Sequence, residues 1–532
     1  MNSKNILGII NGLTNIIFFM ILLYMTGDAG AGLYICAYLV YKVLYVLLVG
    51  GIRASVAKFV SQRRYRGMYD GAKNYFRYNL FFCLITSLIV GALLFILADS
   101  ISTLLFGNAY CGILLQYLCL YFLLHSVNDC LCGYYLGCNN GTLVFIGEIV
   151  YGVVSCVCAP FIIKAFTNYG NKVYALLKNP IVINSYGVTG GVTAMCIAAF
   201  ISMLVLIIGA RGRIKKGKNL FFEGRGESKK GMLRYILLAD LENAKNKLFP
   251  YLLMLAISIV YMINLGKTDI ELVDLYGAFG AFGSKLGIFI LLQDTLYGEF
   301  VNVHKSRIRL DYKRDEIKNF TSSVNSLLKS TIILLLPMVC SVMCYHEGIN
   351  EVYFNSSVAE GSTIVTLCGI CLLFNGIDLS LKAILMSSGY SKSSSGGELV
   401  GFAVGFIYTI VWGLMGNAVS GLIYGVMLAL LSSMLIHAFV VFRGFSIRLN
   451  DLLQKFVTAA IASLVLSVLD MILARFLNMN LLILTLCIIC GYVIYVISLM
   501  ALRGVNSRDI KALKGSLLYY PINFLSGLFG VR

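Results

Sequence analysis

Three basic side chains lie inside long apolar runs of this sequence, where charge is costly. Lys42 and Arg53 occur in one run and Lys285 in another. An ionisable residue within an apolar span is expensive, and it commonly marks a substrate or ion pathway. Ammonium and guanidinium groups bind anions, and guanidinium offers a planar fork of donors. We expect these three residues to bind an anionic group; the structural alternative is snorkelling, or a buried ion pair with Asp294 or another carboxylate.

The spacing of these cations predicts where they lie on their helices. Lys42 is about 11 residues into a helix that starts near residue 31, which places it ~16 Å below the outer end at 1.5 Å per residue. Arg53 follows about three turns later and should face the same way. Leu275-Tyr276 precedes Lys285 much as Leu33-Tyr34 precedes Lys42. We therefore expect Lys42 and Lys285 to face each other across a central cavity.

Two carboxylates recur in matching contexts, Glu148 in Gly-Glu-Ile-Val and Glu398 in Gly-Glu-Leu-Val. Their recurrence suggests ion coupling. The structural alternative, which we favour, is that each lies near a helix N-terminus, where the helix dipole stabilises a carboxylate. The Cys-x-x-Cys pairs that begin at Cys368 and Cys487 lie in apolar runs without His or carboxylate neighbours, so we expect no metal site.

The composition indicates that lipid surrounds most of the chain. The sequence of 532 residues is 59% hydrophobic and only 13% charged, whereas soluble domains carry about 25% charged residues. In lipid every backbone polar group must be paired within the fold, which leaves helices or a closed barrel. The apolar runs are longer and more continuous than barrel strands. We expect an all-α polytopic membrane protein.

The apolar runs predict about 14 transmembrane helices, because about 20 apolar residues cross a bilayer core. The first six runs are 6–26, 31–60, 77–98, 111–136, 142–166 and 186–210. The next six are 234–264, 271–300, 323–345, 362–388, 396–415 and 418–442, and a final pair is 452–477 and 480–502.

The loop charges predict the orientation. Lys and Arg cluster in 63–77, 211–234, 302–318 and 443–448, which all fall on one side of the predicted membrane. Cytoplasmic loops carry such an excess, so both termini should be cytoplasmic. This bias, together with contact with anionic membrane lipids, accounts for the net charge of +18. We expect no nucleic-acid partner.

An internal repeat predicts two pseudo-symmetric lobes of six helices each. Residues 131–150 match 381–400, and later 188–190 match 419–421 and 202–204 match 433–435. Six spans separate the copies, so they share one membrane orientation, as parallel repeats do. The expected parts are an N-terminal lobe 1–232, a C-terminal lobe 233–443, two additional helices in 444–503 and a cytoplasmic amphipathic tail 504–532.

The segment 27–62 resembles the early part of the multidrug/oligosaccharidyl-lipid/polysaccharide (MOP) exporter superfamily, in its polysaccharide-export and stage V sporulation protein B branch, which is related to lipid II flippases. The matching elements are the Gly-rich turn through Gly30–Tyr34, Gly51-Ile52 and Lys58-Phe59-Val60. Members often carry an Arg just before the Gly-rich turn, where this chain has 23–26 as Leu-Tyr-Met-Thr.

The resemblance implies an alternating-access flippase for lipid-linked oligosaccharide or polysaccharide precursors of the bacterial cell envelope or spore wall, in the cytoplasmic membrane. Its substrate would be an undecaprenyl-type lipid-linked saccharide whose pyrophosphate binds Lys42, Arg53 and Lys285, and glycan-assembly enzymes would be its partners. No cofactor is expected; coupling would use the membrane potential, H⁺ or Na⁺, with Glu148, Glu398 and Asp294 as candidate carboxylates.

Two alternatives remain open. A multidrug or cation antiporter of the same superfamily would need carboxylates in its cavity, whereas the mid-depth residues here are mainly cations. A membrane-embedded polysaccharide polymerase or ligase would need a long outer loop with catalytic residues, and the outer loops here are short. No catalytic triad or nucleotide-binding loop stands out, so we expect no enzymatic activity.

Overall fold

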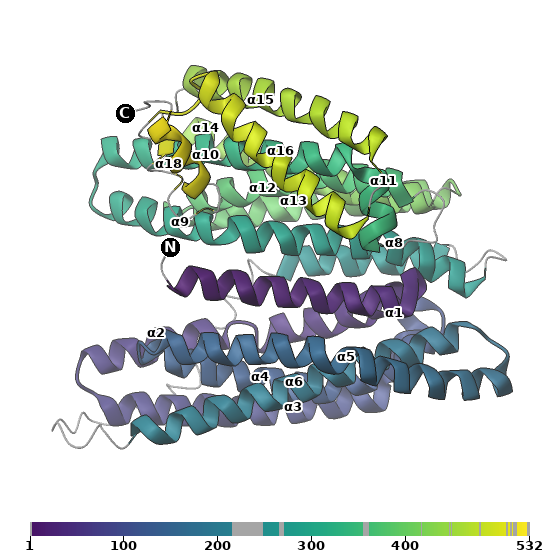
Figure 1. The fold of residues 1–532 in the computed structure, drawn as a ribbon. Coiled ribbons are helices and arrows are strands. Elements are labelled where there is room, and N and C mark those ends of the chain that lie inside the picture. The colour runs from purple at the N-terminus through teal and green to yellow at the C-terminus, as the bar shows by residue number, and fades with distance from the viewer. Residues whose placement is uncertain are drawn as a thin grey trace. The chain divides into compact units, whose positions relative to one another are not determined.

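The computed structural model describes residues 3–214, 248–264, 271–354, 361–416, 418–445, 447, 449–477, 480–506, 509–510, 513, 516 and 519–528. The chain divides into two compact units. The N-terminal unit comprises Ile6–Gly280, and the C-terminal unit comprises Ala281–Arg532 with Met1–Asn5. The described elements of both units are helices (Figure 1).

The N-terminal unit is a helical bundle. Its helices are α1 (Ser3–Leu48), α2 (Ile52–Tyr65), α3 (Tyr69–Phe106), α4 (Tyr110–Gly137), α5 (Gly141–Leu177) and α6 (Ile181–Ile214), followed by an apolar helix Leu248–Asn264. Helix α1 is kinked at Gly27, whose φ of 67° and ψ of −177° suit a residue without Cβ. The first two expected spans therefore form one kinked helix, and a break at 49–51 separates its second part from α2.

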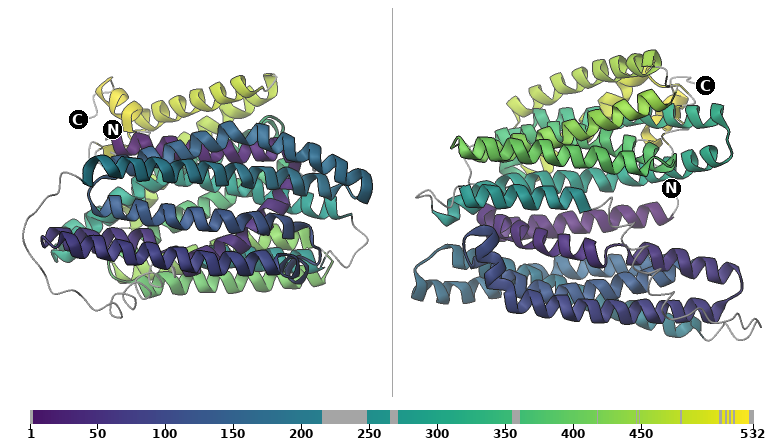
Figure 2. Two further views of the ribbon diagram at one scale, coloured as in Figure 1. Left: turned by 90° about the horizontal axis from the view of Figure 1, so that it is seen from below. Right: turned by 180° about the vertical axis from the view of Figure 1, so that it is seen from behind.

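The C-terminal unit contains the remaining helices. They are α8 (Leu272–Gln293, which begins in the N-terminal unit), the π-helical turn η1 (Asp294–Gly298), α9 (Glu299–Lys313), α10 (Ile317–Cys344), α11 (His346–Ile349), η2 (Asn350–Phe354), α12 (Gly361–Ser387), α13 (Ser391–Leu414), α14 (Ala418–Gly444), α15 (Leu449–Phe476), α16 (Leu481–Ala501) and α18 (Tyr519–Leu528). Within this unit α13 packs along α14, and α10 along α15, as the views in Figure 2 show.

The expected polytopic all-α fold is confirmed. The described residues contain 12 helices long and apolar enough to cross a membrane, and the first of these includes both early spans. The shorter helix Leu248–Asn264 covers the end of the expected span 234–264. The rest of that span, most of the basic segment 211–234 and parts of the tail 504–532 lie outside the described residues.

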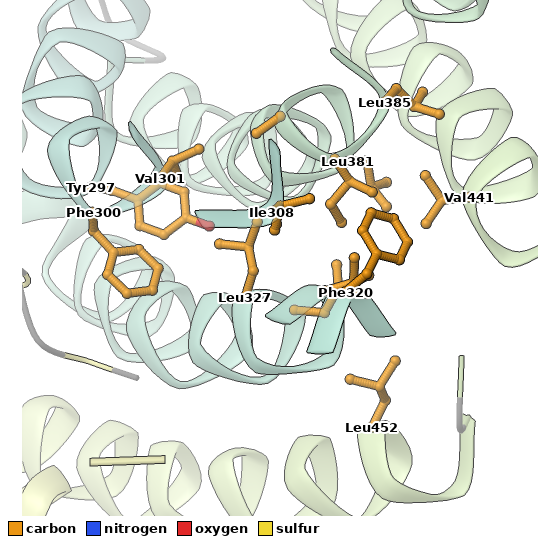
Figure 3. Close-up of a cluster of buried hydrophobic side chains, with 14 residues drawn as sticks. Tyr297, Phe300, Val301, Ile308, Phe320, Leu327, Leu381, Leu385, Val441 and Leu452 are labelled. Atoms are coloured by element: carbon orange, nitrogen blue, oxygen red, sulfur yellow. The ribbon is translucent and has the colours of Figure 1, made fainter. Parts of the chain in front are cut away.

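An apolar core holds the C-terminal unit together (Figure 3). Tyr297 and Phe300 pack with Leu327 of α10 and Leu381 of α12, and all four are buried. The Tyr297 hydroxyl is hydrogen bonded to Thr331 and Ser380, which satisfies the polar end of this buried ring. Leu452 extends the cluster to α15, the first of the two additional helices. The core thus joins the repeat helices of this unit to the C-terminal pair.

The sequence repeat is also a repeat of contacts, observed in each unit by itself. A Cβ added to Gly147 of α5 would lie 3.0 Å from Leu206 of α6. A Cβ added to Gly397 of α13 would meet the ring of His437 of α14. Gly147 and Gly397 are equivalent in the first repeat match, and Leu206 and His437 in the second. The α5–α6 and α13–α14 pairs therefore cross at the same repeat position.

Small residues permit the close approach of α13 and α14. A Cβ on Gly405 would lie 2.6 Å from the carbonyl oxygen of Gly425, and one on Gly401 would lie 2.7 Å from that of Ala429. The Gly-x-x-x-Gly spacing of Gly401 and Gly405 on α13, and of Gly421 and Gly425 on α14, therefore serves helix packing.

Candidate functional site

Lys42 lies in a cage of tyrosine rings in the N-terminal unit. Its Nζ is 5.5 Å from the ring centre of Tyr45, 5.7 Å from that of Tyr38 and 5.8 Å from that of Tyr251. Positions 38, 42 and 45 share one face of α1 because they are separated by four and three residues. The Lys42 side chain is half-buried, and it forms no ion pair with any residue that the structure describes. Its ammonium group is therefore held by rings rather than by a counter-charge.

The same face of α1 carries a ladder of tyrosines. Ring centres are 5.2 Å apart between Tyr34 and Tyr38, and 5.5 Å apart between Tyr38 and Tyr41. The Tyr41 hydroxyl is hydrogen bonded to Nδ1 of His125 at 2.6 Å. The hydroxyl groups of Tyr41 and Tyr45 are therefore tied to α4, whereas that of Tyr34 donates to the Met195 sulfur of α6.

Arg53 interacts with two carboxylates. Its guanidinium lies 2.5 Å from Oε1 of Glu148 on α5 and 3.9 Å from Oδ1 of Asp129 on α4. Tyr45 donates a hydrogen bond to Asp129 at 2.7 Å, which links this ion pair to the Lys42 cage. The Arg53 side chain is 37% exposed to solvent. The site thus contains both signs of charge, not cations alone.

Two sequence interpretations are corrected by this geometry. The break at 49–51 places Lys42 and Arg53 on different helices, so their spacing does not determine a common face. Glu148 is in the second turn of α5, whereas the helix dipole acts within the first turn. An ion pair with Arg53, not the helix dipole, is the observed partner of Glu148.

His125 and Asp129 are site residues that the sequence analysis missed. Both lie within the expected span 111–136, and their spacing of four residues puts them on one face of α4. An ionisable residue inside an apolar run was the available signal, the same one that singled out Lys42.

Lys285 is completely buried in the C-terminal unit. Its Nζ donates to the carbonyl oxygen of Gly361 at 3.4 Å and lies 5.7 Å from the ring centre of Phe354. Asp294, a suggested partner, is exposed, and it forms no ion pair within the described part of the chain.

A second charged cluster in the C-terminal unit contains Glu398. Lys382 of α12 lies 2.9 Å from Glu398 of α13 and 2.8 Å from Asp378. Asp378 also contacts Nδ1 of His437 at 2.6 Å. Asp378 and Lys382 lie within the expected span 362–388 but were not among the predicted site residues, whereas Glu398 was. Like Glu148, Glu398 is in the second turn of its helix and pairs with a basic side chain.

Neither a scan of protein-family models nor a search of curated protein sequences finds a match. Solved structures do match. An inward-facing multidrug resistance MATE family transporter of the MOP superfamily aligns with a TM-score of 0.63 at 15% identity, covering 81% of this chain and 94% of that one.

Two further structures resemble the chain. The lipid II flippase MurJ, in an inward closed conformation, aligns with a TM-score of 0.60 at 14% identity over 93% of this chain and 98% of its own. A MOP superfamily transporter from Pyrococcus furiosus aligns with a TM-score of 0.56 at 14% identity over 82% and 94%. The chain is therefore a multi-pass membrane protein with the fold of MOP superfamily transporters.

Proposed function

We propose that this protein is an alternating-access exporter that flips lipid-linked oligosaccharide or polysaccharide precursors. The observation that carries the proposal is the Lys42 ammonium, which is half-buried in a membrane-spanning helix among three tyrosine rings and forms no ion pair within the described residues. Cation–π contacts stabilise a cation by roughly 0.5–2 kcal/mol. A diphosphate would supply the missing counter-charge in a setting of low dielectric constant, where attraction is strong.

The tyrosine ladder supports a saccharide beside that anion. Each tyrosine offers an apolar ring face and a polar hydroxyl. A sugar ring has the complementary combination of C–H faces and hydroxyl edges. Tyr38 and Tyr45 contribute rings to the Lys42 cage, and Tyr34 and Tyr41 continue the same helix face. Tyr38 is the partly exposed member of the ladder, whereas Tyr34, Tyr41 and Tyr45 are buried, so a sugar bound beside Lys42 would stack first on Tyr38.

An apolar groove of about 290 Å³ in the C-terminal unit supports a lipid chain on the substrate. Helices α10, α12, α14 and α15 form it, and Leu335, Ile377, Ala438 and Phe456 are among its lining residues. Among the described lining residues, Thr331 alone has a polar side chain. The similarity to the lipid II flippase covers 93% of this chain, against 81% for the MATE transporter described above.

A multidrug or cation antiporter is the second candidate, and Asp129 favours it. This carboxylate lies within the apolar helix α4 beside the Tyr45 ring, a setting that attracts organic cations. However, Asp129 and Glu148 already lie near Arg53, and the nearby Lys42 would repel a cation. We therefore rank the antiporter below the flippase.

The test is a flipping assay in proteoliposomes with a fluorescent undecaprenyl-diphosphate-linked saccharide. Dithionite added outside bleaches only the outer leaflet, so flipping appears as loss of the protected fraction. We expect rapid bleaching with the wild-type protein, strong slowing in Lys42→Gln and partial recovery in Lys42→Arg. Lys58→Gln is the matched control, because Lys58 is an exposed lysine on α2 outside the cage.

Two outcomes would contradict the proposal. One is equal flipping by the Lys42→Gln and wild-type proteins. The other is no flipping of the diphosphate lipid together with uptake of a fluorescent organic cation, which would establish the antiporter.

A further inference from the structure

Four ionisable side chains form a buried cluster in the C-terminal unit. We call Asp378, Lys382, Glu398 and His437 the acid–base cluster. Their side chains are 1%, 20%, 8% and 0% exposed, respectively. Buried charges are costly unless they are paired, so the partner and the protonation of each group in this cluster must be identified.

The partners of His437 require a hydrogen on both ring nitrogens or a shared proton. Nε2 lies 2.8 Å from the carbonyl oxygen of Ser394, which can only accept. Nδ1 lies 2.6 Å from Oδ1 of Asp378. A neutral imidazole carries one N–H, and that hydrogen is used by the Ser394 carbonyl. A second proton must therefore lie between His437 and Asp378, on one or the other.

The charge count agrees with this extra proton. Asp378 and Glu398 supply two negative charges, and Lys382 supplies one positive charge. With the extra proton the acid–base cluster is neutral, and without it a net negative charge remains among buried groups. Oε2 of Glu398 has no hydrogen-bond partner among the described residues. The cluster therefore has fewer hydrogen-bond donors than its carboxylate oxygens could use. The proton is thus the component that balances the cluster.

The repeat shows that the fold does not need this chemistry. The N-terminal unit has Asn128, Cys132 and Leu206 at the positions of Asp378, Lys382 and His437. Asn128 donates to Ser202 at 3.3 Å, and Ser433 donates to Asp378 at the same distance. At these three positions the equivalent helices therefore pack with neutral residues, whereas the fourth position keeps a carboxylate, Glu148, which is paired with Arg53 of α2. The ionisable side chains of Asp378, Lys382 and His437 are thus specific to the C-terminal copy and are not required for the helix crossing that the repeat shares.

Within the described part of the C-terminal unit, few other charged groups lie near the cluster. Helix α9 packs on α12 and carries His304 and Lys305, and the Lys305 Nζ lies 3.8 Å from the Met386 sulfur, a turn beyond Lys382. On α10, Lys329 is paired with Asp451 of α15 at 3.5 Å. The remaining basic groups of α13 and α14 are Lys392 and Arg443, and both are exposed. The His437–Asp378 proton is therefore governed mainly by Lys382 and Glu398.

We propose that the acid–base cluster is a proton-binding site through which the exporter couples flipping to the proton gradient, an inference that rests on the proposed function. One proton lies between Nδ1 of His437 and Oδ1 of Asp378 in the loaded state. Its release leaves a neutral imidazole and a carboxylate, and one negative charge remains on the cluster. Loading and unloading thus change the charge of the C-terminal unit by one.

Proton occupancy is tested without any substrate. The chain has 4 histidines, so ¹⁵N-histidine NMR of the protein in nanodiscs is tractable, and His437→Leu identifies the signal while copying Leu206. At pH 7.5 we expect the proton to be seen in one of two places. Either the NMR spectrum shows a doubly protonated His437, or the infrared difference spectrum between the wild-type protein and Asp378→Asn shows a carboxylic acid band from Asp378. A neutral His437 with no such band would overturn the site.

Coupling is tested in the proteoliposome assay with an imposed pH gradient. The gradient should change the flipping rate of the wild-type protein, and the double variant Asp378→Asn/His437→Leu should lose that response. His346→Gln, which removes a partly exposed histidine outside the cluster, should retain it. If the wild-type protein flips the lipid at a rate that does not depend on the pH gradient, coupling is refuted and the proposed function stands. If the protein does not flip the lipid but NMR or infrared spectra show the proton on His437 or Asp378, the proposed function is refuted and the proton site stands.

Discussion

Oε1 of Glu148 lies 2.5 Å from the guanidinium of Arg53, in an ion pair that joins α5 to α2. In the other unit the equivalent Glu398 lies 2.9 Å from Lys382, which comes from α12. The repeat therefore keeps the carboxylate and its basic partner but takes the base from a different helix. Each pair lies next to an aspartate, Asp129 or Asp378.

Removing one member of the first pair should destabilise the N-terminal unit. Glu148→Gln leaves Arg53 with only the more distant Asp129, and because Arg53 is partly exposed we expect a loss of about 1–2 kcal/mol, less than for a fully buried pair. Thermal unfolding of the purified protein in detergent measures the change. The swap Arg53→Glu/Glu148→Arg should recover part of it; a swap no better than the single variant would argue against a stabilising ion pair.

The crossing of α13 and α14 should not tolerate a methyl group at Gly405. Its Cβ would approach the Gly425 carbonyl oxygen to 2.6 Å, and overpacking of this kind costs about 1–3 kcal/mol. Gly396→Ala is the matched control on the same helix, because nothing lies within 4 Å of the Cβ it would add. We expect a lower unfolding temperature for Gly405→Ala, and an unchanged or higher one for Gly396→Ala. Equal effects would refute the steric explanation.

Asp470 should anchor the C-terminal helix pair to α10. It is buried on α15 and accepts hydrogen bonds from Ser341 Oγ at 3.1 Å and from Tyr345 OH at 3.0 Å. Asp470→Leu leaves both donors without their acceptor, which costs about 1–3 kcal/mol.

The corresponding control removes the donors as well. Ser341→Ala/Tyr345→Phe/Asp470→Leu leaves no buried polar group unpaired, so it should unfold at a higher temperature than Asp470→Leu alone. If the triple variant is instead the less stable one, packing and not hydrogen bonding dominates at this contact.

Filling the apolar groove should slow the flipping of lipids with long chains. Ala438 of α14 lines the groove, and Ala438→Phe would occupy the space that we assign to the lipid chain. We expect a several-fold lower rate for an undecaprenyl substrate in the dithionite assay, and a smaller effect for a short-chain analogue. Leu435→Phe, at an exposed position of the same helix, should be neutral. An effect independent of chain length would remove the groove from the substrate path.

The sequence alone determined the class of fold and several elements of the candidate sites. Long apolar runs require helices in lipid because each backbone polar group must be paired within its own segment, a local constraint that a local pattern reveals. The repeat identified Glu148 and Glu398 as equivalent residues, and the cost of intramembrane charge singled out Lys42, Arg53 and Lys285. The same signal, applied to every span, would have included Asp129, Asp378 and Lys382.

Only the tertiary structure decided which of these groups meet. Arg53 and Glu148 are 95 residues apart, and His437 and Asp378 are 59 apart, so their pairing depends on how helices pack and not on any local pattern. The kink at Gly27 and the break before α2 likewise set which face each residue of the expected span 31–60 presents. A helix can be inferred from its own residues, but a buried charge is explained by its partner, which lies on another helix.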